Sequence, residues 1–466
     1  MAMSAANRAV CWFLGACALM LAYSAGALAN PTPDILHEFN LKDGAVPLAG
    51  LVWDKGELYG TTSRGGNTAC QGGYGGGCGV VFKLTPPASG EAVWTETVLY
   101  KFAGANDGHF PNSALIVGKS GVLYGTTANG GDNTACPTYT YDIDIYDYPG
   151  CGVVFSLAPP AAGKTAWTYT TIYKFTGRSD GAFPSGGLVM DKSGALYGMT
   201  SAGGDSAACP NDPYLGAPRG CGVAFKLVPP AAGKTAWTET VLHDFASAKE
   251  RFRPSGIVMD DTGALYGTAT TGSNESLGIV FELTPPAAGQ ASWTSTVLYK
   301  FARSSGGIGL VDGLIMDKAG ALYGTTYEDK TATTSQPVTS TVFRLQPPAA
   351  GKTAWTGTVL HTFAGHGAPS YLGGLVFDKN GVLYGTAAEG GGSRGGFGVV
   401  FKLTPASGNS PWPQTEVYRG GSPVSVVLGS SGAVFGVASE GGSPNCEWDG
   451  LAYDSGSCGY IFKVVP

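Results

Sequence analysis

The stretch Leu58-Tyr59-Gly60-Thr61-Thr62 decides the fold, because the chain of 466 residues repeats it. Successive copies begin 51 to 73 residues apart, and the last one is degenerate. The six later copies begin at Leu123, Leu196, Leu265, Leu322, Leu383 and Val434. A phrase that returns at such a period indicates a repeat architecture, in which each repeat is one supersecondary unit.

Three other segments recur in step with this phrase. A Gly-Leu-Val-x-Asp segment precedes it, as at 187–191, and Gly-Val-Val-Phe-Lys-Leu follows it, as at 79–84. The fourth segment, Trp-Thr-x-Thr-Val-Leu-Tyr-Lys-Phe, occupies 94–102 in the first repeat. Each segment is short, rich in β-branched and aromatic residues, and bounded by Gly, Pro or Asp, so each reads as a strand. We name these strands A, B, C and D in chain order.

Seven repeats of four strands predict an all-β fold, a seven-bladed β-propeller with four antiparallel strands per blade over residues 30–466. The two ends of the repeat region complement each other. Residues 34–39 form a D strand that no blade precedes, and residues 459–464 form a C strand that no D strand follows. We therefore expect the N-terminal strand to complete the last blade and close the ring without a free edge.

The first 29 residues have the pattern of a cleaved signal peptide. Arg8 supplies the positive charge, residues 9–23 are apolar, and Ala27-Leu28-Ala29 is a small-x-small cleavage site. We expect a secreted or periplasmic protein. The segment 14–17, Leu-Gly-Ala-Cys, also resembles a lipobox, so a lipoprotein anchored at Cys17 is the alternative. No later apolar run reaches the ~20 residues that a membrane-spanning helix needs.

The repeat as a whole resembles the GloVer tandem repeat of exported bacterial proteins. The match lies in Leu-Tyr-Gly-Thr-Thr, the following Gly-Gly, and Gly-Cys-Gly-Val-Val-Phe-Lys-Leu, and it covers most of residues 34–466. The repeat is also similar to NHL-type propeller repeats. The resemblance implies no established activity and no catalytic residues. Many members carry a C-terminal anchor, and we expect none after the repeats here.

Ten cysteines suit an exported chain. Cys11 and Cys17 fall in the signal segment, and the other eight form local pairs between strands B and C. An even number of cysteines in an exported chain predicts disulfides. No pair has the close spacing that zinc sites favour. The expected disulfides are Cys70–Cys78, Cys136–Cys151, Cys209–Cys221 and Cys446–Cys458.

The loops between strands B and C differ most between repeats, and function is expected where repeats differ. The four loops that carry cysteines belong to blades 7, 1, 2 and 3, which ring closure would make consecutive. Several of their residues combine an aromatic face with hydrogen-bonding groups, which suits a sugar ring. The candidate ligand-binding residues are Asp142, Asp144, Tyr146, Asp147 and Tyr148 in blade 2, Tyr214 and Arg219 in blade 3, and Trp448 and Asp449 in blade 7.

Three interpretations of these loops remain. The loops form either a ligand-binding surface or ordinary surface loops without a ligand, or they bind a metal ion. Asp142, Asp144 and Asp147 could bind Ca²⁺ through hard oxygen ligands, although the Gly and distal Glu of an EF-hand are missing. Repeated aromatic residues such as Tyr59 and Trp94 are expected to pack between blades, because nearly every blade has them.

Histidine gives little support for catalysis. Of the five histidines, His37, His243 and His361 occupy a slot that holds Tyr in the other D strands, so we interpret them as structural. His109 and His366 lie in loops between strands D and A, after blades 1 and 5, and either could act singly as a general base. Only His109 has a nearby carboxylate, Asp107. However, Asp107-Gly108 recurs as Asp180-Gly181, which favours a turn.

The chemistry of the whole chain narrows the function classes. The net charge of −6 gives no basic footprint for nucleic acid. No P-loop, Rossmann or Gly-x-Ser-x-Gly motif has a supporting context. We predict a monomeric binding or scaffolding propeller for a glycan or a surface protein, with no cofactor. The alternatives are a polysaccharide lyase or glycoside hydrolase on the same face, and a purely structural secreted protein.

Overall fold

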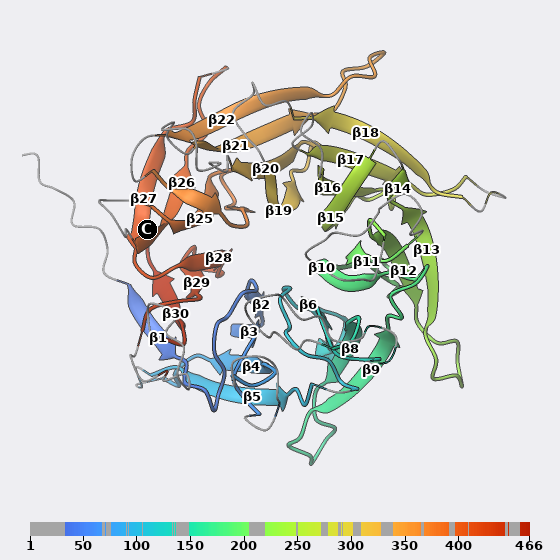
Figure 1. Ribbon diagram of the computed structural model, residues 1–466. Coiled ribbons are helices and arrows are strands. Elements are labelled where there is room, and N and C mark those ends of the chain that lie inside the picture. The colour runs from blue at the N-terminus through green and yellow to red at the C-terminus, as the bar shows by residue number, and fades with distance from the viewer. Residues whose placement is uncertain are drawn as a thin grey trace, which may run out of the picture. The chain divides into compact units, whose positions relative to one another are not determined.

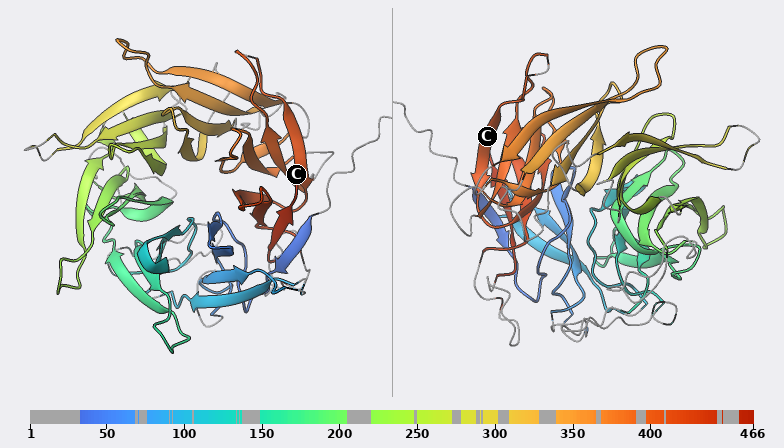
Figure 2. Two further views of the ribbon diagram at one scale, coloured as in Figure 1. Left: turned by 180° about the vertical axis from the view of Figure 1, so that it is seen from behind. Right: turned by 45° about the horizontal axis from the view of Figure 1, so that its top comes forward.

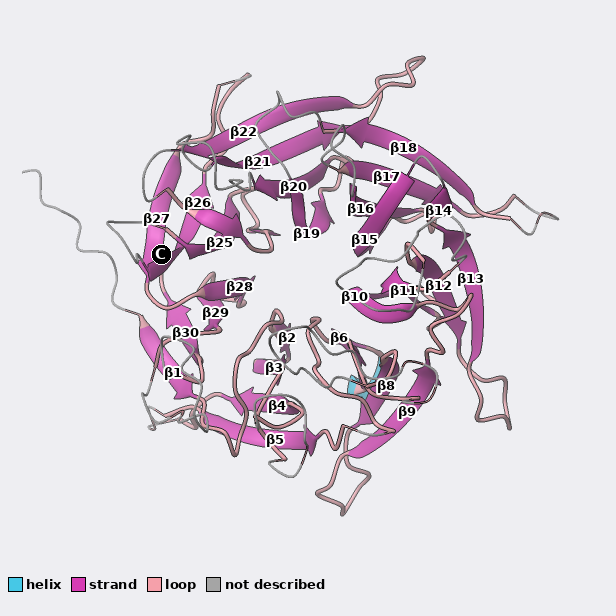
Figure 3. Ribbon diagram, viewed as in Figure 1, coloured by secondary structure: helices cyan, strands magenta, loops and turns pink. Residues whose placement is uncertain are grey.

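The structure is a computed structural model, and its compact unit spans Pro31–Pro466. Strands make up nearly all of its regular structure (Figure 3), and one 3-10 turn, Lys119–Gly121, is present. No helix in the described residues is long and apolar enough to cross a bilayer. The structure describes residues 33–466 apart from 68–69, 71–75, 90, 92, 105, 133, 135, 137–148, 205–219, 248–249, 272–277, 288–289, 291, 302–308, 328–338, 365–367, 391–396, 409, 443–445 and 447–456. The expected signal peptide, residues 1–29, lies outside this set and remains a prediction.

Seven antiparallel sheets form the blades of a β-propeller, as the repeat predicted (Figure 1). In each blade strand A lies nearest the centre of the ring and strand D lies at the periphery. Blade 1 consists of β2 (Val52–Asp54), β3 (Glu57–Thr62), β4 (Val80–Thr85) and β5 (Thr95–Lys101). Blade 2 consists of β6 (Ile116–Val117), β7 (Leu123–Thr127), β8 (Val153–Ala158) and β9 (Thr168–Lys174). Blade 3 consists of β10 (Ala182–Met190), β11 (Leu196–Ala202), β12 (Val223–Val228) and β13 (Thr238–Asp244).

The next blades keep the same order of strands, with small additions on the A side. Blade 4 consists of β14 (Ala246–Ser247), β15 (Glu250–Met259), β16 (Leu265–Thr271), β17 (Ile279–Thr284) and β18 (Thr294–Lys300). Blade 5 consists of β19 (Gly309–Met316), β20 (Leu322–Tyr327), β21 (Thr339–Gln346) and β22 (Thr356–Ala364). In blade 6, strand A is split into β23 (Ser370–Leu372) and β24 (Val376–Phe377), followed by β25 (Leu383–Glu389), β26 (Phe397–Leu403) and β27 (Gln414–Arg419).

Blade 7 is built from both ends of the repeat region, which confirms the predicted closure. Its sheet order is β28 (Pro423–Leu428), β29 (Val434–Ala438), β30 (Tyr460–Val464) and β1 (Asp34–Glu38). Strands β1 and β30 are antiparallel, with Asp34 opposite Lys463 and Glu38 opposite Tyr460. Figure 2 shows the N-terminal strand beside the last blade from two further sides. Closure therefore supplies the outer strand that β30 would otherwise lack and completes a four-stranded sheet in blade 7.

The glycine of the Leu-Tyr-Gly phrase is required by packing inside each blade. In blade 3, a Cβ on Gly198 would lie 2.5 Å from Cζ of Phe225, which belongs to the neighbouring strand C. The corresponding distance is 2.5–2.6 Å in blades 1, 2, 4, 5 and 6 and 2.3 Å in blade 7. The phenylalanine ring thus occupies the space that any other side chain would need. The pairs are Gly60/Phe82, Gly125/Phe155, Gly198/Phe225, Gly267/Phe281, Gly324/Phe343, Gly385/Phe401 and Gly436/Phe462.

The recurring aromatic residues pack between neighbouring blades, as expected. Tyr59 of blade 1 lies 6.3 Å from Trp167 of blade 2, measured between ring centroids. Trp94 of blade 1 lies 5.7 Å from Phe435 of blade 7. The same Tyr–Trp contact recurs at the next three junctions, at 6.1–6.3 Å, as Tyr124/Trp237, Tyr197/Trp293 and Tyr266/Trp355.

Replacing the glycine of one blade tests the packing between strands B and C. We expect Gly198→Ala to lower the free energy of unfolding by about 1–3 kcal/mol, because the new methyl group overpacks the ring of Phe225. Denaturant unfolding measures the change. In a double-mutant cycle, Phe225→Leu should recover part of the loss. Fully additive effects would show that the two residues are not coupled.

The closing strand offers a second test of the fold. Phe39 is 2% exposed and packs edge-on against Phe82 at 5.2 Å, so Phe39→Ala should cost about 3–5 kcal/mol. Ile35 lies on the same N-terminal segment but is 45% exposed, and Ile35→Ala is the matched control with an expected loss below about 1 kcal/mol. Equal losses in thermal or denaturant unfolding would contradict the observed docking of the strand.

Candidate functional site

Disulfides close the bases of the cysteine-bearing B–C loops in three consecutive blades. Disulfides join Cys70 to Cys78 in blade 1, Cys136 to Cys151 in blade 2 and Cys446 to Cys458 in blade 7, with Cα–Cα distances of 5.7, 5.3 and 5.5 Å. In blade 3, Cys221 is also disulfide-bonded, and Cys209 lies outside the described residues. Three predicted disulfides are thus confirmed, and the pairing of the fourth remains a prediction.

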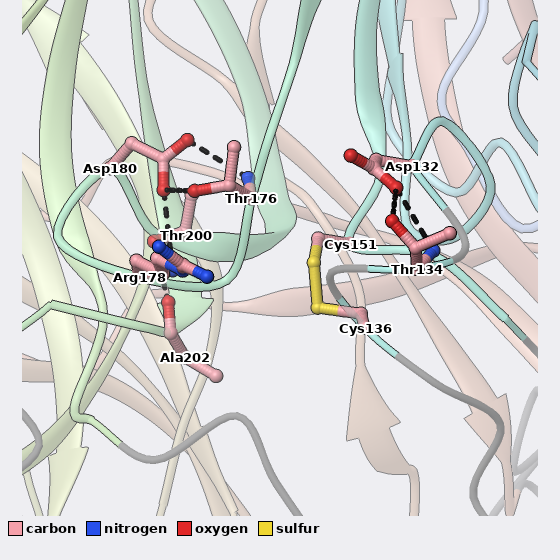
Figure 4. The surroundings of a disulfide bond; sticks show 9 residues. All are labelled: Asp132, Thr134, Cys136, Cys151, Thr176, Arg178, Asp180, Thr200 and Ala202. Carbon is pink, nitrogen blue, oxygen red and sulfur yellow. Dashed lines mark hydrogen bonds between the residues drawn. A yellow bond between two sulfur atoms is a disulfide. The ribbon is translucent and has the colours of Figure 1, made fainter.

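Each second cysteine immediately precedes strand C, and the disulfides sit beside the D–A loops. In blade 1, a Cβ on Gly104 of the D–A loop would lie 2.5 Å from the sulfurs of Cys70 and Cys78. The B–C and D–A loops of this blade therefore share one face of the propeller. Figure 4 shows the disulfide of blade 2, which we call a staple, together with the hydrogen-bonded turns of Asp132 and Asp180.

Two aspartates order the backbone next to the blade 2 staple. Asp132 accepts hydrogen bonds at Oδ1 from the backbone and the hydroxyl of Thr134, at 2.9 and 2.7 Å. Asp180, in the following D–A loop, accepts from the backbone and the hydroxyl of Thr176, at 2.9 and 2.7 Å. Cys136 is fully buried among apolar neighbours. The base of this loop is therefore held by a disulfide, polar turns and a packed core.

The residues predicted to contact a ligand belong to the B–C segments of the sequence and lie outside the described residues. This applies to the tyrosines, aspartates and tryptophan that we identified from composition, and equally to the possible Ca²⁺ ligands. Their roles remain predictions. The set comprises Asp142, Asp144, Tyr146, Asp147, Tyr148, Tyr214, Arg219, Trp448 and Asp449.

His109 and Asp107 are both described, and each has a structural environment. Asp107 accepts hydrogen bonds at Oδ2 from the hydroxyl of Tyr100 at 2.7 Å and from the backbone of Ala103 at 2.9 Å. His109 is 4% exposed. Burial, and secondly the charge of Arg64, lower its pKa to about 4. The imidazole is therefore neutral at pH 7 and shielded from solvent, and Asp107 holds the turn that recurs at Asp180.

A ring nitrogen of His109 lies within 4.8 Å of the sulfurs of Cys70 and Cys78. This would be a set of soft metal ligands if both cysteines were thiolates. Because the sulfurs form a disulfide, the set cannot coordinate a metal in this state. His109 instead belongs to the packed base of the blade 1 loop.

Glutamates on strand D meet the preceding blade at two junctions. Burial raises the pKa of Glu239 in blade 3 to about 7, and the charge of Asp180 raises it further. Burial also raises the pKa of Glu96 in blade 1 to about 7. In each side chain, Oε1 is buried without a hydrogen-bond partner. These carboxyls were not singled out by the sequence analysis, because strand D has a polar residue at this position in several blades.

A groove of about 790 Å³ lies between blades 1 and 2 on the opposite side, where the A–B turns and C–D links meet. Lys83 pairs with Glu57 at 2.7 Å, and Tyr59 donates a hydrogen bond to Glu57 at 2.7 Å. Burial favours the neutral acid, but the hydrogen bonds from Lys83 and Tyr59 outweigh it and lower the pKa of Glu57. Trp167 also lines the groove.

The sequence contained one signal for this groove. The residue before Leu in the repeated phrase is Ala or Val in six blades, and blade 1 alone has Glu57 there. The groove thus combines an aromatic surface with an ion pair whose charges already neutralise each other. Its Tyr–Trp contact recurs between other blades, so packing explains the aromatic part.

Substituting Glu239 tests its raised pKa. A carboxyl whose pKa rises from 4.5 to about 7 on folding stabilises the protein fully below pH 4.5 and loses that contribution as the pH rises through 7. We expect Glu239→Gln to flatten the fall in unfolding free energy between pH 5 and pH 8 by about 1 kcal/mol, a value reduced for the partial exposure of the site. Exposed Glu91→Gln is the control, and identical pH profiles for the wild type and Glu239→Gln would contradict the shift.

Comparison with known proteins identifies the repeat and the fold. The family model described as the Gloeobacter/Verrucomicrobia repeat matches residues 24–210, 148–336 and 213–448. No curated protein sequence matches the chain.

Solved structures similar to this chain include an ulvan lyase from a new family of polysaccharide lyases, at 9% identity and a TM-score of 0.53. The match covers 93% of this chain and 96% of that one. An ulvan lyase bound to -[GlcA(1-4)Rha3S]- matches at 10% identity and a TM-score of 0.52, with the same coverage. A glucose dehydrogenase matches at 13% identity and a TM-score of 0.40, over 94% of this chain and 100% of that one. At these identities the likeness shows the fold alone.

Proposed function

The chain belongs to the Gloeobacter/Verrucomicrobia repeat family, and we propose that this member is an exported binding or scaffolding propeller. Its ligand would be a glycan. Its binding surface would be the arc formed by the B–C loops of blades 7, 1, 2 and 3, which we call the stapled arc. The observation that carries the proposal is the set of disulfides at the loop bases in blades 7, 1 and 2.

The closure of the ring supports a continuous arc. Because β1 pairs with β30, blade 7 is the neighbour of blade 1. The sequence has no cysteine in blades 4, 5 or 6, so the staples are confined to one side of the ring. A loop with a fixed base loses less entropy when it binds, and each side chain that binding immobilises costs about 0.5–1.5 kcal/mol. Stapling thus favours a role for these loops in recognition.

The amino-acid composition of the B–C segments supports a glycan as the ligand. Tyr146, Tyr148 and Trp448 supply flat apolar faces, and neighbouring carboxylates supply acceptors for hydroxyl groups. An ulvan lyase of similar fold was solved bound to -[GlcA(1-4)Rha3S]-, and this likeness supports a saccharide as the ligand. The buried, neutral His109 gives the enzyme alternative no accessible base among the described histidines of blade 1.

A glycan array with the mature chain tests the proposal. Alanine at Trp448 or Tyr146 should weaken binding to any glycan found by at least about tenfold, because each substitution removes a stacking surface. The midpoint of thermal unfolding should stay within about 1 °C of the wild type, since substitutions in surface loops change stability little.

The control is Phe397→Ala, which removes an aromatic side chain, 65% exposed, that borders the B–C loop of blade 6 outside the arc. It should leave glycan binding unchanged. Loss of binding in this control but not in the arc variants would place the ligand elsewhere. Release of reducing ends or unsaturated uronates from a bound polysaccharide would favour the lyase or hydrolase alternative.

A further inference from the structure

Three side chains with metal-binding chemistry meet at the seam where the ring closes. One ligand atom each from His37, Asp43 and Glu96 lies within 4.8 Å of the other two. His37 is on β1 of blade 7, Asp43 is in the turn that leads from β1 into blade 1, and Glu96 is on β5 of blade 1. We call these three residues the seam cluster. They are separated by up to 59 residues in sequence and come from two blades.

Two atoms of the seam cluster are buried and lack hydrogen-bond partners. These are Nε2 of His37 and Oε1 of Glu96, and each is shielded from solvent. Nε2 lies 3.5 Å from Oδ2 of Asp43, within the range of an ion pair but without a hydrogen bond. Burying polar atoms without partners costs free energy, so their convergence calls for a species that satisfies them together.

The surroundings hold the cluster in place. The backbone amide of Asn40 donates to Oδ1 of Asp43 at 2.8 Å, and the Asn40 side-chain amide donates to Oδ2. The ring of His37 packs edge-on against Phe39 at 5.0 Å. Lys101 lies on the same strand as Glu96, and its positive charge attracts the Glu96 carboxylate. Its Nζ donates a hydrogen bond to the backbone oxygen of Lys42 at 2.7 Å. Partners of this kind fix the orientation of metal ligands in known sites.

We propose that the seam cluster binds a first-row divalent metal ion, with Zn²⁺ as the representative case, and so links the N-terminal strand to blade 1. An imidazole nitrogen with two carboxylate oxygens is a ligand set that Zn²⁺ accepts. In a tetrahedral zinc site with bonds of about 2.0–2.1 Å, neighbouring ligand atoms are about 3.3 Å apart. The 3.5 Å between His37 and Asp43 is close to that separation, and the longer side chain of Glu96 can close the remaining gap.

The other junctions of the ring show what is specific to the seam. Between blades 2 and 3 the equivalent residues are Tyr173, Asp180 and Glu239, and the hydroxyl of Tyr173 donates to Asp180 at 3.1 Å. Between blades 1 and 2, Tyr100 bonds to Asp107 and stacks on the next strand D, with no glutamate at that position. The imidazole occurs together with both carboxylates only at the seam, among these three junctions.

These junctions supply substitutions that the fold already accepts. His37→Tyr gives the seam the residue types of the junction between blades 2 and 3. Glu96→Tyr gives blade 1 the residue that blade 2 has at the same position, Tyr169. Each variant removes one ligand and replaces it with a side chain that packs in the equivalent slot elsewhere in the ring.

The test is metal binding by the mature chain, first stripped with a chelator and then titrated with Zn²⁺ at pH 7.5. Calorimetry should find one site per chain. A Zn²⁺ concentration of about 100 times the dissociation constant should raise the midpoint of thermal unfolding by about 3 °C. His37→Tyr and Glu96→Tyr should each weaken binding by at least about tenfold and abolish the rise. Mg²⁺, which binds imidazole poorly, should have no effect.

The outcomes separate a metal site from its alternatives. If His37→Tyr keeps the wild-type response to Zn²⁺, the ion binds elsewhere and the proposal is wrong. The proposal is also wrong if Zn²⁺ has no effect on the wild type and a lower pH stabilises the wild type but not Glu96→Gln. In that case the cluster holds a proton. The substitution Glu440→Gln, at an exposed carboxylate in blade 7, is the control for weak surface binding and should leave both readouts unchanged.

Discussion

The contact between a phenylalanine ring of strand C and a bare glycine Cα of strand B is the constraint on which the rest of this propeller depends. It occurs in all seven blades, and in each one the ring fills the volume that a Cβ would need. The phenylalanine is almost fully buried, so the pair forms the centre of the blade core. The same short approach recurs in every blade. Neighbouring blades then pack together around the ring, with a Tyr–Trp contact at four consecutive junctions.

One junction of the ring differs from the others, because the two ends of the repeat region meet there. Strand β1 joins β30 there, and Phe39 continues the contact by donating its backbone amide to Gly459 at 3.0 Å. Closure has two consequences for function. It places the disulfide-bearing loop of blade 7 next to those of blades 1 and 2. It also brings His37 of the N-terminal strand close to Glu96 of blade 1.

The sequence predicted the fold because periodicity and strand pattern are local properties. The phrase beginning at Leu58, its phenylalanine partner and the unmatched end strands were sufficient to specify seven blades and their closure. The seam cluster and the groove beside Glu57 were not predicted, since both depend on how side chains of neighbouring blades approach each other. Sequence spacing carries no information about that approach. His37 illustrates the difference, because its slot was correctly identified as the tyrosine slot of strand D, where it faces Ile461 as Tyr100 faces Val81. What the slot faces across the junction could be learned only from the structure.

In a repeat protein, a residue that differs from the residue at the same position of other repeats calls for an explanation. The half-buried slot of strand D holds Tyr at most junctions, and the hydroxyl of Tyr100 or Tyr173 donates a hydrogen bond to the aspartate of the following loop. With an imidazole in place of the hydroxyl, Nε2 of His37 lies 3.5 Å from Oδ2 of Asp43 and has no hydrogen-bond partner. Histidine also fills this slot at two other junctions, as His243 and His361, and the seam differs in placing the imidazole beside Asp43 and Glu96. The histidine at the seam therefore has a cost in the absence of a bound species, and a metal ion shared with Asp43 and Glu96 would offset that cost at the junction that holds the N-terminal strand in place.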